Sequence, residues 1–94
     1  MNDINRVRRT VRNVVSHQLA PAKIIDVELT EDVDHDGDPI LRVRVIFEAK
    51  DDSLGAKNVL GLARHLREPL ELLGETASPV FSFMTSKEFA GEAA

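Results

Sequence analysis

The chain has 94 residues, a formal net charge of −4 and no cysteine, tryptophan or tyrosine. This length supports one small domain with a single two-layer core. The lack of cysteine excludes disulfides, thiolate catalysis and cysteine-ligated metal centres. No apolar run approaches the roughly 18 residues that a membrane span needs, so we expect a cytoplasmic protein that makes no membrane contact. We expect residues 1–90 to form the domain and residues 91–94 to be a disordered tail.

Charge is distributed unevenly along the chain. The first 24 residues contain five basic residues and one acidic residue, whereas residues 25–55 contain ten acidic residues and three basic ones. This is not the broad basic surface of a dedicated nucleic-acid-binding protein. The acidic middle segment is compatible with a basic protein partner.

The chain opens with a helical pattern. Apolar residues recur at spacings of three and four from Ile4 to Leu19 and predict an amphipathic helix. Asn2 or Asp3 can cap its start, and Pro21 ends it because proline lacks the amide proton that a helix interior requires. Four arginines lie off the apolar stripe, namely Arg6, Arg8, Arg9 and Arg12.

Alternating apolar and polar residues predict two half-buried strands, at Lys23–Glu31 and Leu41–Glu48. A two-residue turn at Asp36-Gly37 would set each apolar residue of one strand against a polar residue of the other, which the two-residue period forbids. A three-residue loop at 35–37 restores the match and supplies a glycine where a bulged turn needs positive φ. The predicted pairs are Leu29–Val43, Val27–Val45, Glu28–Arg44 and Thr30–Arg42.

A second helical stripe runs from Val59 to Leu73 and predicts a helix that begins near Ser53 and stops at Gly74. Pro69 lies inside this pattern, so we expect a kink or break near residues 67–69. The β-branched and aromatic segment 80–85 predicts a short last strand. Ser86 can cap a final frayed turn. The phenylalanines at 47, 81, 83 and 89 are interpreted as core residues.

The predicted fold class is therefore α+β, in the order helix, strand, strand, helix, strand. We expect a three-stranded sheet that contains the antiparallel hairpin, with two helices packed on one face. The open sheet face, or an unpaired edge strand, is where a second chain would most easily add.

An acidic segment occupies the loop between the first two strands. Its candidate metal ligands are Asp32, Asp34, Asp36 and Asp38. It begins like a calcium-binding EF-hand loop, but Val43 stands at the position of the bidentate glutamate. We interpret the segment as a hairpin turn, because turns favour aspartate and glycine. Weak calcium binding is the alternative.

Catalytic motifs are absent from the sequence. The three histidines, at positions 17, 35 and 65, lack metal-ligand spacing. Neither Ser53 nor Ser82 has the context of a catalytic nucleophile, and the sequence contains no dinucleotide-binding fingerprint and no P-loop. We therefore expect no enzymatic activity, no cofactor and no small-molecule substrate.

The element order resembles the KH-like arrangement of ribosome-binding factor A. The resemblance rests on the arginine-rich first helix, the Leu66-Arg67 end of the long helix and the closing strand at 78–83, and it includes no specific motif. The glycine-rich RNA-contacting element of KH domains is missing. The same order is also similar to the cytoplasmic dimerisation domain of cation-efflux transporters, without its metal-ligand histidines.

These observations favour a small non-catalytic protein that binds another protein or itself, as an accessory or antitoxin-like module. The alternative that the KH-like resemblance implies is RNA or ribosome binding, which would use the four arginines of the first helix, since arginine is suited to phosphate. That alternative ranks second because the chain is acidic overall. Calcium binding at the acidic loop ranks third.

Overall fold

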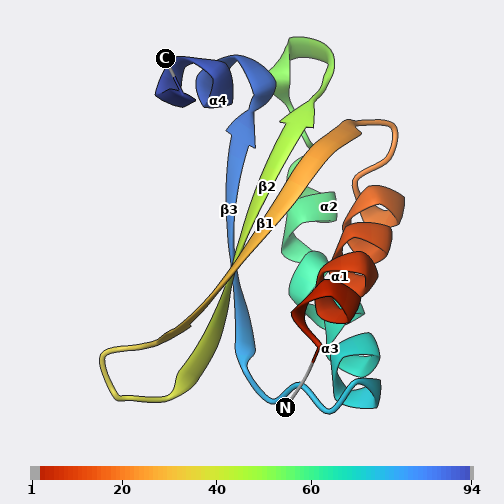
Figure 1. The fold of residues 1–94 in the computed structure, drawn as a ribbon. Helices are drawn as coiled ribbons and strands as arrows, with labels where there is room; N and C mark the ends of the chain where they lie inside the picture. Colours follow the sequence, from red (N-terminus) through yellow and green to blue (C-terminus); the bar gives the residue numbers. More distant parts are fainter. Residues whose placement is uncertain (1–2, 94) are drawn as a thin grey trace.

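The computed structural model describes residues 3–93 (Figure 1). None of the helices within this range is both long enough and apolar enough to cross a membrane. The elements are α1 (Ile4–Gln18), β1 (Lys23–Val33), β2 (Pro39–Glu48), a short 3₁₀ turn (Lys50–Asp52), α2 (Ala56–Leu60), α3 (Leu62–Leu72), β3 (Ser78–Thr85) and α4 (Ser86–Ala93).

The three strands form one twisted sheet in the order β1-β2-β3 (Figure 1). β1 and β2 pair antiparallel, whereas β2 and β3 pair parallel. Parallel neighbours need a crossover connection, which α2 and α3 provide on one face of the sheet. The crossover leaves β3 at one edge of the sheet and β1 at the other.

The core lies between the sheet and the helices α1 and α3, which confirms the predicted α+β class with helices on one face. The side chains that fill it are at most 3% exposed. They are Val7, Val11 and Val15 from α1, Leu62, Leu66 and Leu70 from α3, and Val27, Leu41, Val43 and Val45 from the sheet. Burying each such side chain contributes about 1.5–3 kcal/mol.

The hairpin has the predicted register. All four expected pairs occur, from Val27 opposite Val45 to Thr30 opposite Arg42. The Gly37 amide donates to the Asp34 carbonyl over 3.0 Å, and Gly37 takes a φ of 85°. The apolar pattern and the turn glycine therefore agree on one register. The strands run further than expected, to Val33 and from Pro39, so the hairpin projects from the body of the molecule (Figure 1).

The second helix differs from the prediction at both its start and its break. It begins at Ala56, after Asp51 and Asp52 adopt left-handed φ values of 58° and 55°, a conformation that aspartate tolerates. The helix is interrupted at Gly61. The following helix, α3, then continues through Pro69, where the kink was expected. The buried Leu66 and Leu70 on either side of the proline anchor α3 in the core that it shares with α1. This packing outweighs the one hydrogen bond that the proline cannot make.

The C-terminal tail is helical through Ala93, so the disordered segment expected from residue 91 is not what the structure shows; Ala94 lies outside the described residues. A capping box starts α4 at Thr85, one residue before the expected Ser86. The Thr85 amide and hydroxyl both donate to Glu88 Oε1, and the Glu88 amide donates to Thr85 Oγ1. At the other end of α4, Arg44 donates to Glu92 and fastens the helix to β2.

We predict that α4 depends on the ionised Glu88 carboxylate. The Thr85 amide, and then its hydroxyl, hold the pKa of Glu88 below its ordinary value. A lowered folded-state pKa means that this contribution is present at neutral pH and is lost as the pH falls through the lowered value. Backbone chemical shifts should show α4 fading over that acid range in the wild type. In Glu88→Ala the helix should be frayed already at neutral pH.

The neighbouring exposed residue supplies the control. Lys87→Ala should leave the α4 shifts unchanged, since Lys87 lies outside the capping box. A full α4 in Glu88→Ala would show that the cap does not hold the helix.

Candidate functional site

The two edges of the sheet differ in chemistry. Side chains of α1 close the first part of the β1 edge, from residue 24 to residue 27, and the rest of β1 carries the charged residues Glu28, Glu31 and Asp32. Arg8 Nε donates to the Val27 carbonyl over 2.9 Å, and Arg8 Nη2 lies 2.6 Å from Asp26 Oδ1. Arg12 Nη2 lies 3.4 Å from the carbonyl oxygens of Ile24 and Ile25. The register of β1 shifts between Ile24 and Asp26 as well. Occupied carbonyls and a bulge are both features that prevent another strand from pairing.

The β3 edge is open. Within residues 3–93, β3 pairs with β2 alone. Its eight residues, Ser78–Thr85, include no charged side chain, and Val80 is 43% exposed. Pro79 is tolerated here because an edge strand does not need every amide proton. A long uncharged edge of this kind is a template for an added strand.

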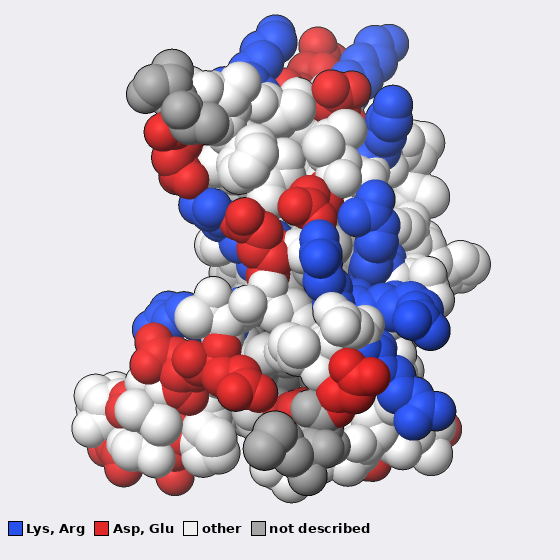
Figure 2. Space-filling model, in the orientation of Figure 1, with Lys and Arg blue, Asp and Glu red and all other residues white. Residues whose placement is uncertain are grey.

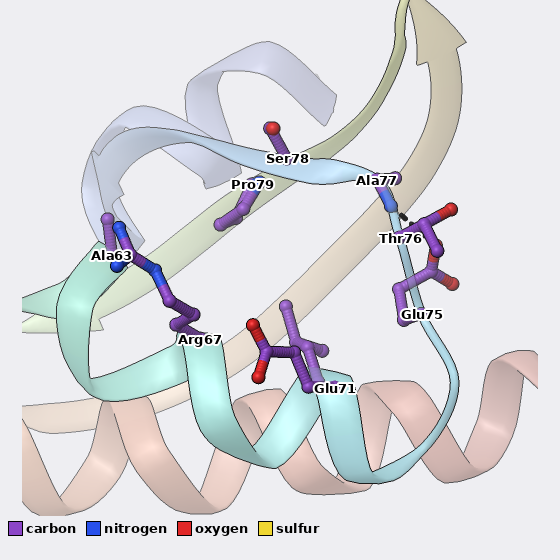
Figure 3. Close-up of a pocket in the computed structure, with 9 residues that line it drawn as sticks. Ala63, Arg67, Glu71, Glu75, Thr76, Ala77, Ser78 and Pro79 are labelled. Atoms are coloured by element: carbon purple, nitrogen blue, oxygen red, sulfur yellow. Dashed lines mark hydrogen bonds between the residues drawn. The ribbon is translucent and has the colours of Figure 1, made fainter.

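A first hollow of about 530 Å³ lies beside the start of β3. Figure 3 shows Arg67 and Glu71 rising from α3 on the side that faces the strand, while Pro79 points into the space between them. Ser78 points the opposite way, as the alternation of a strand requires. This hollow therefore lies on the helix side of β3, and its lining includes one cationic residue, Arg67, and two acidic residues, Glu71 and Glu75.

A second hollow of about 510 Å³ lies beside the end of β3. Its apolar lining comes from Phe47, Leu54 and Phe83. Charged groups surround the opening, namely Asp52, Lys87 and Glu88. The two hollows thus flank the same strand, one at each end.

The strip of β3 between the hollows is aromatic. Phe81 and Phe83 stack with their ring centroids 6.2 Å apart and pack against the core while staying half-buried. From Pro79 to Thr85 the strand rises about 20 Å, at roughly 3.3 Å per residue. An added strand of about seven residues would therefore reach both hollows. We define the β3 groove as this strand together with the two hollows.

The arginines proposed for RNA binding divide into two groups. Arg8 and Arg12 hold the β1 edge, as described above. Arg6 and Arg9 are exposed, and their side chains make no hydrogen bond or ion pair within the described residues. Lys and Arg residues gather on the side of the molecule where α1 lies, and acidic residues gather on the hairpin (Figure 2). Two of the four predicted phosphate ligands are thus already committed within the fold.

The candidate metal ligands divide in the same way. Carboxylate oxygens of Asp34, Asp36 and Asp38 lie within 4.8 Å of one another. Asp32 is separate, because Arg42 binds its carboxylate over 2.8 Å and lowers its pKa. One carboxylate oxygen of Asp34 accepts from the amides of Asp36 and Asp38. The cluster therefore has a structural explanation as the turn that closes the hairpin.

The sheet face opposite the core is occupied by ion pairs rather than left open. Arg44 donates to Glu28 and to Glu92, and its guanidinium lies 5.8 Å from the Phe89 ring centroid. The two carboxylates raise the pKa of Arg44 above its ordinary value. Next to it Ile46 is fully buried. Around Arg44 this face is thus part of the fold, whereas Arg42, Val80 and Ser82 elsewhere on it are exposed, as is the adjoining β3 edge.

Sequence reasoning named an unpaired edge as a binding surface but did not find the β3 groove. The missing information was which strand lies at which edge. One signal was present: Arg8 and Arg12 each follow a buried valine of α1, so they lie on the flank of its apolar stripe, where a neighbouring strand can be reached. Arg9 lies on the outer side.

Comparison with protein-family models, with curated proteins and with solved structures finds no significant match for this chain. The function is therefore argued from the geometry of the molecule.

We predict that Arg8 stabilises the fold and that Arg9 does not. Arg8→Ala should lower the free energy of unfolding by about 1 kcal/mol, because it removes the hydrogen bond to the Val27 carbonyl and the shortest ion pair of Asp26, both of which are partly exposed to solvent. Arg9→Ala, one residue further along α1, should change it by less than about 0.5 kcal/mol. Urea unfolding of the two variants measures the difference. Equal values would show that the β1 edge is not held by this contact.

Proposed function

We propose that this chain is a cytoplasmic, non-catalytic interaction module that binds an extended polypeptide segment by β-strand addition at the β3 groove. The observation that carries the proposal is the pairing of an uncharged, unpaired strand edge with a hollow at each end of the same strand. In strand addition, main-chain hydrogen bonds supply affinity and pockets for alternate side chains supply specificity. The β3 groove offers both.

The hollows favour particular side chains on the bound segment. Both lie on the helix side of β3, so residues of the added strand enter them at alternate positions. The second hollow has an apolar lining and suits an aliphatic or aromatic residue. The first carries Arg67 and Glu71 at its rim and suits a residue with a polar end. The bound segment is therefore expected to pair a polar residue at one end with an apolar residue at the other.

Nucleic-acid binding through α1 stays the alternative. With Arg8 and Arg12 engaged at β1, it would rest on Arg6 and Arg9. Two free arginines support less phosphate contact than four do, because each neutralised phosphate adds to the affinity. A substitution of Arg6 and Arg9 tests this alternative without disturbing the β1 edge.

A selection of displayed peptides tests strand addition. Random peptides of about seven residues, the length that spans the groove, are selected on dilute immobilised protein, and the winners are titrated into isotope-labelled protein. We expect amide shifts along β3 and around both hollows. Ala63→Trp should weaken binding by about tenfold or more, because the new indole fills the first hollow where an anchoring side chain would sit.

Ala56→Trp is the matched control, since Ala56 is an exposed helical alanine outside both hollows. It should bind like the wild type. Shifts centred on α1, or binding that Ala63→Trp leaves unchanged, would contradict strand addition at β3.

A further inference from the structure

We infer that the strand added at the β3 groove is β3 of a second copy of this chain, which pairs antiparallel across a two-fold axis that passes beside Ser82. This inference rests on the proposed strand addition and names its partner. The resulting dimer has one continuous six-stranded sheet, with α1 and α3 of both copies on the same face.

The two edges of the sheet give the first argument. In the dimer both β3 edges are consumed, and the only remaining edges are the two copies of β1. Arg8 and Arg12 occupy the carbonyls of those edges from residue 24 to residue 27, and Glu28, Glu31 and Asp32 place charges along the rest of β1. The assembly therefore ends after two copies, as a closed two-fold dimer does, and does not grow into a filament.

The alternation of β3 restricts the register. Directly opposed residues of an antiparallel pair lie on the same face, so an even-numbered residue must face an even-numbered one. Placing Ser82 on the axis satisfies this rule and uses the strand from Pro79 to Thr85. On the helix side, Phe81 then faces Phe83 of the second copy. On the other side, Val80 faces Met84 of the second copy.

These pairs match in chemistry. An aromatic ring meets an aromatic ring, and such cross-strand pairs stabilise sheets. Val80, 43% exposed in the single chain, gains an apolar neighbour. Placing Phe81 on the axis instead would set Ser78 against Met84. The uncharged strand meets itself without like-charge repulsion, which a charged edge would create.

Both hollows carry charges of both signs. Antiparallel pairing brings the first hollow of one copy, with Arg67, Glu71 and Glu75 in its lining, against the second hollow of the other, with Asp52, Lys87 and Glu88. Each hollow thus brings one cationic group to the acidic groups of its counterpart.

Charge substitutions on the axis test the inference. Sedimentation should give the wild type twice the 10.4 kDa mass of one chain. Ser82→Glu should raise the dimer dissociation constant by about tenfold or more, because two carboxylates then face each other. In the single chain the new carboxylate lies beside Arg44, its cross-strand neighbour, so folding is preserved. Ser82→Lys should weaken the dimer in the same way.

The decisive sample is an equimolar mixture of Ser82→Glu and Ser82→Lys, which should recover the dimer, since the two charges then attract. Thr30→Glu is the matched control, because Thr30 has an arginine, Arg42, as its cross-strand neighbour on β2 but lies on β1. It should remain dimeric. A dimer unaffected by Ser82→Glu, or a mixture that stays monomeric, would overturn this pairing.

One outcome separates this inference from the proposed function. A wild-type chain that is monomeric, and whose β3 still binds selected peptides, would overturn self-pairing and leave strand addition intact. A chain that neither dimerises nor binds peptides along β3 would overturn both.

Discussion

The guanidinium group of Arg8 bridges the Val27 carbonyl and the Asp26 carboxylate at the outer side of β1. Every three-stranded open sheet has two edges with unpaired backbone groups, and each must be satisfied by some partner. In this molecule Arg8 and Arg12 of the first helix satisfy the carbonyls of one edge from residue 24 to residue 27, and charged side chains such as Glu31 and Asp32 protect the rest of it. The binding surface that we propose is consequently at the other edge, and its location follows from where the arginines of α1 are used.

The direction of β3 explains the form of the other edge of the sheet. Because β3 runs parallel to β2, the chain must cross over the sheet through α2 and α3 before it can enter the strand. The crossover places α3 beside the start of β3 and the loop at Asp52 beside its end. The gaps at those two places are the hollows of the β3 groove. The topology thus creates an edge and its side-chain pockets together.

Much of the fold was predictable from local pattern, and the candidate site was not. The register of the hairpin followed from matching apolar residues such as Val27 and Val45 across a three-residue loop, because parity permits few alternatives. The direction and place of β3 left no comparable trace, since the helix that precedes β3 allows this strand to reach either edge of the hairpin. Without the direction of β3, the sequence could not show that Arg8 contacts an edge of the sheet or that a groove lies beside Pro79. The helix break at Gly61 was not predicted, because the low helix propensity of proline favoured a break near Pro69. Packing instead keeps α3 continuous through Pro69.

The most direct test of the account is an isotope-filtered NOE experiment on a mixture of labelled and unlabelled chains. It reports only contacts between different copies, so it shows which strand meets which without any substitution. The account predicts contacts between the Ser82 backbone protons of the two copies and between the Phe81 and Phe83 rings across the interface. Contacts from β1 or α1 in their place, or no contact between copies at all, would contradict it.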